Sequence, residues 1–381
     1  MAEPLKNLIN DEVVRQAGHH LQRVWPGFDR TRFEALSING LQALAFKDRA
    51  RHLGRAMEST LPDDFHLAAD VLQAALKPVQ ASSIDPDKEL GLLKTDEHGL
   101  AGWVLWPVGE VVTQRGMAHP ERALQLLHAL TQRFTAEFAI RPFIVAHPEL
   151  CFATLAQWTH DPSAHVRRLV SEGSRPRLPW GLRLQSLVKD PTPTLPLLAA
   201  LQDDPSEYVR RSVANHLNDI AKDHPDLLAD WLATHLPTAA EPRRRLLRHA
   251  SRTLIKQGHV GVLGHWGLGT PLLAPVHWAV SPAEVSLGDR LQLSLGLQPK
   301  APVPQTLETD YTVHHVKANG QTSPKTFKGW KLTLAPGQSV RLTKAHAVRP
   351  ISTRQYHPGT HAVDVHINGQ VLAQAAFDLS L

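Results

Sequence analysis

The stretch "DPSAHVRRLV" at residues 161–170 returns 43 residues later as "DPSEYVRRSV" at residues 204–213. Each copy follows an apolar segment of helical periodicity, "HPELCFATLAQWTH" (147–160) before the first and "TPTLPLLAALQD" (192–203) before the second. The sequence therefore repeats a unit of two helices joined at an Asp-Pro turn. Such a unit buries its apolar face only by stacking on its neighbours.

Weaker copies of this unit lie on both sides, in "HPERALQLLHALTQRFTAEFAIRPFI" (119–144) and "EPRRRLLRHASRTLIKQG" (241–258). Helical periodicity extends from about residue 5 to 258. The period and the paired helices resemble HEAT-type repeats. We therefore predict an all-α superhelical solenoid whose concave face is lined by the second helix of each unit, a face that binds extended partners.

The pattern changes near residue 275, where apolar and polar residues begin to alternate, as in "VSLGDRLQLSLGLQ" (285–298). Turn dipeptides such as Asn-Gly separate these stretches, which predicts a small β-sandwich. The glycine-rich link 258–275 allows the two parts to be set at an angle. The expected domains are a HEAT-like repeat domain at 1–268 and a sandwich at 275–381.

The composition limits the kinds of protein to which the chain can belong. The chain has 381 residues, 42% of them apolar, and a net charge of +5, which is typical of a globular protein of two domains. One cysteine, no zinc-finger spacing and no secretory or membrane-spanning segment predict a reducing cytoplasm. No metal, nucleotide or redox cofactor signature is present, so none is expected.

Arginines recur along the predicted second helices of the repeat units. Arg168 and Arg175 share one helical stripe, and Arg211 repeats the pattern in the next unit. Arginines spaced along a curved surface can contact successive phosphates bidentately; a merely solvated face is the alternative. The candidate phosphate-binding residues of the solenoid are Arg141, Arg168, Arg175, Arg211, Arg245 and Arg248. By contrast, Asp161 with Arg167 and Asp204 with Arg210 are expected to form a structural ladder.

Three carboxylates interrupt this positive stripe. Glu137, Glu172 and Asp219 are predicted on the second helices of three consecutive units, where they would converge across helices about 10 Å apart. An anionic pocket in a basic groove weakens phosphate binding, so a functional pocket must face something cationic. The alternative is local pairing, for instance of Glu137 with Arg141 at i,i+4 spacing.

Two of these carboxylates lie in unusual motifs, "AEFAIRPF" (136–143) and "SEGSRPRLPW" (171–180). With the Val-Arg-Arg helices, these motifs resemble the AlkC branch of the AlkC/AlkD family of bacterial DNA alkylation-repair glycosylases. The similarity covers the whole helical region. Some members of the family carry a C-terminal immunoglobulin-like domain, which the β pattern after residue 275 would supply.

The resemblance implies a monomeric base excision repair enzyme that acts on double-stranded DNA containing alkylated bases. It would excise cationic 3-methyladenine and 3-methylcytosine, exposing the damaged nucleotide by bending the DNA rather than in a deep base-flipping pocket. Carried over by position, the active-site carboxylates would be Glu137, Glu172 and Asp219, with Trp180 closing the second motif. Ionised carboxylates would attract the positive base, stabilise the developing sugar cation and align water.

Other interpretations stay open. Trp180 could stack on the lesion or cap the core of its repeat. The segment from residue 275 is basic, with ten Lys and Arg against six Asp and Glu. A loop with Arg349 and Arg354 could enter the minor groove, so that the segment forms part of a DNA clamp. The alternative is a module for adhesion or stability. The chain could also be a non-enzymatic α-solenoid scaffold or an RNA-directed hydrolase.

Overall fold

The structure, a computed structural model, describes residues 5–79, 86, 88, 92–351 and 354–381. The chain divides into two compact units. The first comprises Met1–Asp223 with Ala240–Ala250, and the second comprises His224–Ala239 with Ser251–Leu381. The predicted domain boundary at 268–275 lies inside the second unit and stays a prediction.

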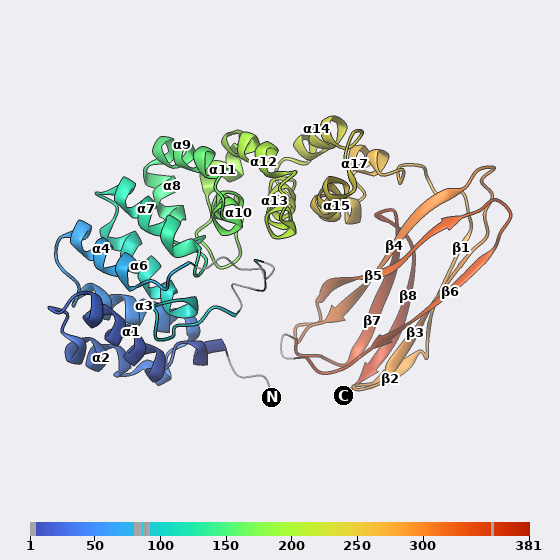
Figure 1. Ribbon diagram of the computed structural model, residues 1–381. Coiled ribbons are helices and arrows are strands. Elements are labelled where there is room, and N and C mark those ends of the chain that lie inside the picture. The colour runs from blue at the N-terminus through green and yellow to red at the C-terminus, as the bar shows by residue number, and fades with distance from the viewer. Residues whose placement is uncertain (1–4, 80–85, 87, 89–91, 352–353) are drawn as a thin grey trace. The chain divides into compact units, whose positions relative to one another are not determined.

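The first unit is helical throughout its described residues, apart from turns and isolated bridges. In Figure 1 its helices follow one another in a curved row, and α10, α13 and α15 lie side by side along the inner side of that row. Its helices are η1 (Leu5–Leu8), α1 (Asp11–Val24), α2 (Arg30–Ile38), η2 (Leu41–Ala43), α3 (Phe46–Glu58), α4 (Phe65–Ala75), η3 (Gly102–Val104), α6 (Leu105–Arg115), α7 (Pro120–Thr131), α8 (Ile140–Ala146), α9 (Pro148–Trp158), α10 (Ala164–Gly173), α11 (Gln185–Lys189), η4 (Thr192–Thr194), α12 (Leu195–Leu201), α13 (Glu207–Ile220) and α15 (Glu241–Ala250).

The Asp-Pro turns start the inner helices in the same way. The carboxylate of Asp161 accepts the backbone N–H of Ser163 over 2.8 Å before α10, and Asp204 accepts that of Ser206 over 2.8 Å before α13. Arg167 donates to the backbone oxygen of Asp161 and, over 2.6 Å, to the carboxylate of Asp204 in the next unit. A structural ladder is present, but its pairs differ from those expected. Within each unit the arginine contacts the backbone oxygen of the Asp, as Arg210 does at Asp204, and the ion pair links consecutive units.

In its described residues, the second unit combines three helices with a two-sheet sandwich. One sheet has the order β1-β3-β6 and the other β2-β8-β7-β4-β5, with every pairing antiparallel except that of β2 with β8. The elements are α14 (Pro225–His235), α16 (Arg252–Lys256), α17 (Val260–His265), β1 (Val276–Ser281), β2 (Glu284–Ser286), β3 (Arg290–Leu297), β4 (Gln305–Val316), β5 (Thr322–Leu334), β6 (Val340–Ala347), β7 (Gly359–Ile367) and β8 (Gln370–Ser380).

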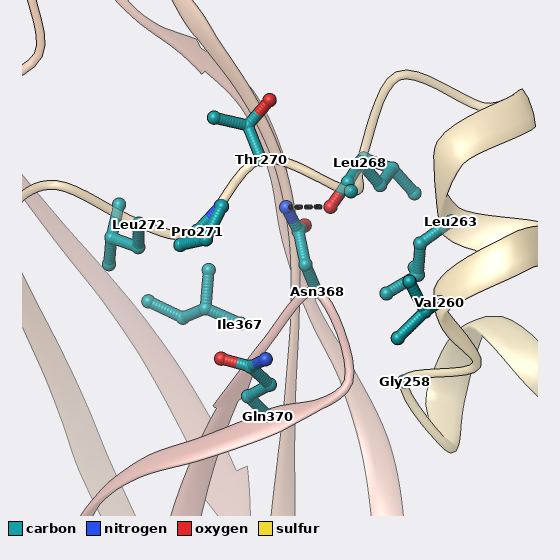
Figure 2. Close-up of a pocket in the computed structure, with 11 residues that line it drawn as sticks. Gly258, Val260, Leu263, Leu268, Thr270, Pro271, Leu272, Ile367, Asn368 and Gln370 are labelled. Atoms are coloured by element: carbon teal, nitrogen blue, oxygen red, sulfur yellow. Dashed lines mark hydrogen bonds between the residues drawn. The ribbon is translucent and has the colours of Figure 1, made fainter.

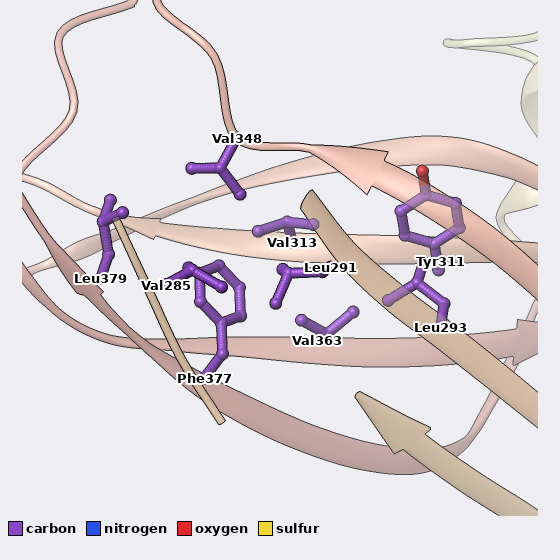
Figure 3. Packing of buried hydrophobic residues seen from close by; sticks show 9 residues of the cluster. All are labelled: Val285, Leu291, Leu293, Tyr311, Val313, Val348, Val363, Phe377 and Leu379. Carbon is purple, nitrogen blue, oxygen red and sulfur yellow. The ribbon is translucent and has the colours of Figure 1, made fainter. Parts of the chain in front are cut away.

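The core of the sandwich lies between the two sheets, where alternate residues of the strands point inward. Figure 3 shows Leu291 and Leu293 of β3 facing Val313 of β4 and Val363 of β7, with Phe377 beside them. All five side chains are at most 3% exposed. The predicted order of an all-helical region followed by an all-β sandwich is confirmed.

A backbone joint connects α17 to the sandwich within the second unit. Gly258 and Gly369 both have positive φ, and a Cβ on Gly369 would lie 2.3 Å from the Cα of Gly258. Figure 2 shows the side chain of Asn368 donating to the backbone oxygen of Leu268, a bond of 3.0 Å. Only glycine allows so close an approach with this backbone conformation.

Candidate active site

The three predicted carboxylates are joined by arginines into one chain of ion pairs. Glu137 accepts from Arg168 over 2.6 Å, and Arg168 also lies 3.7 Å from Glu172. Glu172 accepts from Arg175 over 2.6 Å, and Arg175 continues to Asp219 at 2.8 Å. The predicted convergence of the carboxylates therefore takes the form of an alternating row of negative and positive groups, which we call the carboxylate chain.

Three further groups complete the carboxylate chain. Thr135 donates to the carboxylate of Glu137 over 2.6 Å, and Ser212 donates to that of Glu172 over 2.6 Å. Lys222 donates to the second oxygen of Asp219 over 2.8 Å. No sequence signal singles out Thr135, Ser212 or Lys222, because short polar and lysine side chains are common on helical surfaces.

The carboxylate chain is largely withdrawn from water. Glu137 is 8% exposed, Glu172 6% and Asp219 1%. Burial by itself would raise the pKa of Glu172, but the charges of Arg168 and Arg175 hold that pKa below its usual value. Glu172 is thus ionised at neutral pH, fixed in direction by its hydrogen bonds.

Glu137 differs in place and partner from the expectation. It lies in the turn at 135–139 that precedes α8, and not on a second helix. Its partner is Arg168, so the alternative in which it pairs with Arg141 is wrong. The turn aims the carboxylate of Glu137 toward α10, which brings it into the chain.

Arg141 is fully buried, which contradicts its predicted role in phosphate binding. Its guanidinium donates to the backbone oxygens of Leu182, over 2.5 Å, and Gly173, over 2.8 Å. Burial lowers the pKa of Arg141 to about 10, so it remains charged at neutral pH. Arg141 thereby ties the end of α10 to the loop that carries Trp180.

Trp180 is 69% exposed, so the alternative in which it caps the core of its repeat is wrong. Its φ of 64° lies in the left-handed region, which is uncommon for a residue other than glycine. Lys47 of α3 donates to its backbone oxygen over 3.5 Å. Such strained, exposed conformations are typical of functional sites. The indole also lines a hollow of about 300 Å³ between α3, α6 and the loop.

The other predicted arginines of the solenoid differ in exposure. Arg168 and Arg175 point into the carboxylate chain, and this geometry supports a role in ordering the carboxylates more than contact with phosphate. Arg175 extends from just beyond the end of α10 rather than from the helix itself. Arg211 and Arg245 are exposed and line one hollow of about 220 Å³ between α13 and α15, while Arg248 is half-buried on α15.

The predicted basic loop of the sandwich lies between β6 and β7, and residues 352–353 of it are outside the described part. Arg349 is exposed. Arg354 lies 5.9 Å from the ring centre of Tyr356 and donates to His315 over 2.7 Å. Trp266, in the predicted link, donates its indole N–H to Ser251 over 3.0 Å. Arg354 and Trp266 thus pack within the second unit.

Among the described residues, no group of three or more His, Cys, Asp and Glu side chains is placed to hold a metal ion. The buried Cys151 has its pKa raised to about 12 by desolvation, so its thiol is unreactive near neutral pH. No helix in the described ranges is long and apolar enough to span a membrane.

The chain is similar to known proteins in both its sequence and its fold. Residues 133–254 match a family described as "DNA alkylation repair enzyme", and residues 275–381 match "Uncharacterised protein YhaZ, C-terminal Ig-like domain". The chain is 35% identical to the uncharacterized protein YhaZ of Bacillus subtilis, over 96% of this chain and 97% of that protein. It is also similar to the alkylpurine DNA glycosylase AlkC of Pseudomonas fluorescens, solved bound to DNA containing an abasic site analog. The TM-score is 0.87 at 33% identity, with 100% of both chains covered.

Proposed function

Because the chain belongs to the DNA alkylation repair enzyme family, as an AlkC-like member with a YhaZ-type C-terminal Ig-like domain, we propose that it is a DNA glycosylase. Its reaction is hydrolysis of the N-glycosidic bond of cationic N3-alkylated bases, 3-methyladenine and 3-methylcytosine, in duplex DNA. The observation that carries this proposal is the meeting of Glu137, Glu172 and Asp219 in one buried chain through Arg168 and Arg175.

The chemistry needs no general acid. Alkylation at N3 leaves a positive charge on the base, which makes it a good leaving group. The remaining barrier is the oxocarbenium-like sugar and the delivery of water to C1′. A preorganised, ionised carboxylate lowers this barrier because it stabilises the developing sugar cation and aligns the water. The loss of such a group raises the barrier by on the order of 3 kcal/mol.

The hydrogen bonds of Glu172 support this role. One of its oxygens accepts from Arg175 and the other from Ser212, each over 2.6 Å. Both bonds fix the direction of the carboxylate, while its oxygens keep further lone pairs for a water molecule. A fixed negative group needs little reorganisation as charge develops on the sugar.

Trp180 supports a site open to the DNA surface. With 69% of it exposed, its indole can stack on a nucleotide that bending has exposed, and no deep base-flipping pocket is required. A cationic base over the ring would gain about 0.5 to 2 kcal/mol. The exposed Arg211 and Arg245 would contact phosphates alongside.

The Ig-like domain would contact DNA through Arg349 and Arg354. The double variant Arg349→Ala with Arg354→Ala should weaken DNA binding and flatten its dependence on salt, since fewer counterions would be released. Unchanged affinity and salt slope would remove these two arginines from the interface. A monomeric state and a cytoplasmic location remain predictions.

The direct test of activity is incubation of the protein with methylated duplex DNA, followed by chromatography of the released bases. Release of 3-methyladenine or 3-methylcytosine above the spontaneous rate supports the proposal. Binding of methylated DNA without any release would favour the scaffold.

A further inference from the structure

Residues 174–184, between α10 and α11, form a loop that we call the Trp180 loop. Its tip presents two large apolar side chains to solvent, since Trp180 is 69% exposed and Leu182 is 52% exposed. Because so much of Trp180 lies outside the protein, the backbone of the loop sets the position of its indole. The loop begins directly after α10, whose last two residues are Glu172 and Gly173. The course of the loop therefore decides how far the indole lies from the Glu172 carboxylate.

Arg141 of α8 holds the Trp180 loop from the interior of the protein. Its Nε donates to the backbone oxygen of Leu182 over 2.5 Å, and its Nη1 donates to that of Gly173 over 2.8 Å. A Cβ built on Gly181 would lie 3.4 Å from both Cδ and Nε of Arg141, so the backbone of the loop packs against the arginine side chain. One guanidinium thus joins the last residue of α10 to the tip of the loop.

The burial of Arg141 is unfavourable by itself. The side chain is fully buried, and in the part of the chain that the structure describes it has no ion pair, since both its hydrogen bonds end on backbone oxygens. Its third nitrogen, Nη2, is buried without a hydrogen-bond partner among the described residues. A buried charge of this kind lowers stability relative to an apolar side chain of similar size. What Arg141 provides, and an apolar side chain cannot, is the link between its two oxygens.

The other contacts of the tip are weaker. Lys47 donates to the backbone oxygen of Trp180 over 3.5 Å, and Lys47 is exposed. A hydrogen bond of this length, in contact with water, restrains the backbone little. Within the loop, Gly181 donates to the backbone oxygen of Leu178 over 3.3 Å, which closes the turn without tying it to α10. The restraint on the tip therefore comes mainly from Arg141.

We propose that Arg141 is a positioning residue of the reaction, which fixes the separation between the Trp180 indole and the Glu172 carboxylate. The proposal rests on the glycosylase function above, in which Trp180 stacks on the exposed nucleotide and Glu172 acts on its sugar. Both contacts are made to one nucleotide, so they act together only if the two side chains are held in the right geometry. Glu172 is already fixed by Arg175 and Ser212. Loss of the link would therefore displace the indole and not the carboxylate.

The first test is a double-mutant cycle between Arg141→Lys and Trp180→Ala. Lysine keeps the charge, but its single ammonium nitrogen replaces the planar fork that reaches both oxygens. Arg141→Lys should slow single-turnover release of alkylated base by about 2- to 30-fold, the range expected for loss of the Trp180 contact. In the Trp180→Ala background the same change should slow release by no more than about twofold further. If the two losses instead multiply, Arg141 does not act through Trp180 and the proposal is wrong.

The second test follows the indole in the free protein, without any reaction. The chain has nine tryptophans. When fluorotryptophan replaces them, the fluorine resonance of Trp180 is identified as the one that disappears in Trp180→Ala. Arg141→Lys should shift or broaden this resonance, because the indole is no longer held in one position. A resonance of unchanged position and width would overturn the proposal.

Arg49→Lys is the matched control. Arg49 is also fully buried, and it donates to the backbone oxygens of Lys6, Ile9 and Leu44, all outside the Trp180 loop. This variant should lower the free energy of unfolding but leave the Trp180 resonance and the release rate as in the wild type. If Arg49→Lys altered the resonance as much as Arg141→Lys, a general loss of packing would explain both, and the positioning role would be refuted.

Arg141→Met is the second variant, for the case that Arg141→Lys does not fold. It removes both donors without leaving a charge in the interior, and the same results are expected of it in both tests. Failure of the wild type to release any base would refute the glycosylase function. The fluorine resonance depends on no activity and tests the positioning of Trp180 by itself, so the two failures are distinguishable.

Discussion

The guanidinium of Arg175 donates to the carboxylate of Asp219 over 2.8 Å, although 44 positions separate the two residues in the chain. Arg175 also holds Glu172, so one arginine joins α10 to α13. Replacement by alanine would remove the nearest cationic partner of buried Glu172 and would leave buried Asp219 with Lys222 alone. We expect Arg175→Ala to lower the free energy of unfolding by about 3 to 5 kcal/mol, measured by urea denaturation.

Arg177→Ala is the control for this loss. Arg177 pairs with Asp223 through two bonds of 2.6 Å, but near the surface. A pair exposed to water contributes at most about 1 kcal/mol. Equal losses in the two variants would contradict the buried character of the Arg175 pair.

His216 makes stability depend on pH. It is fully buried, and desolvation lowers its pKa from 6.5 to about 3. Between these values the unfolded chain binds a proton that the folded chain does not, so stability falls as pH falls from 6.5 toward 3. His216→Gln should reduce the slope of unfolding free energy against pH by about 1.4 kcal/mol per unit across this window. Parallel slopes for the two proteins would show that His216 is not buried in its neutral form.

Trp180→Ala separates function from stability. Because the side chain is 69% exposed, its removal should change the free energy of unfolding by no more than about 0.5 kcal/mol. Release of alkylated base should nevertheless slow by about 2- to 30-fold, the equivalent of the cation–π contact. A melting temperature near that of the wild type with unimpaired base release would exclude Trp180 from the site.

Gly369→Ala tests the backbone joint of the second unit. The new Cβ would lie 2.3 Å from the Cα of Gly258, at a φ of 78°. We expect a loss of more than about 2 kcal/mol in unfolding free energy. Gly337→Ala is the control, since Gly337 has a similar φ of 72° and no heavy atom near the added methyl. If both variants lose a similar unfolding free energy, the loss comes from the positive φ and not from the contact with Gly258.

The repeats were predictable because their signals are local. The Asp-Pro turns at 161 and 204 recur at one period, and each Asp accepts the backbone N–H two residues on. The alternation of strands such as β3 is likewise visible in the sequence. Both follow from contacts between neighbours in the chain.

The partners of Glu137 and Arg141 were not predictable in this way. The i,i+4 spacing favours their pairing, but α7 ends at Thr131 and a turn redirects Glu137 toward Arg168, 31 positions away. Arg141 is drawn to the backbone oxygens of Gly173 and Leu182. Such distant partners depend on the packing of whole units, which spacing does not encode.

The most direct test of the carboxylate chain is the single-turnover rate of base release from methylated duplex DNA by the wild type and Glu172→Gln. Thermal melting and DNA-binding measurements confirm that the variant is folded and bound. Glu149→Gln provides the control for a lost surface charge, because Glu149 is exposed on α9. Glu172→Gln should release base roughly a hundredfold more slowly, while Glu149→Gln should match the wild type. A folded, DNA-bound Glu172→Gln that releases base at the wild-type rate would contradict the assignment of this buried carboxylate to the reaction.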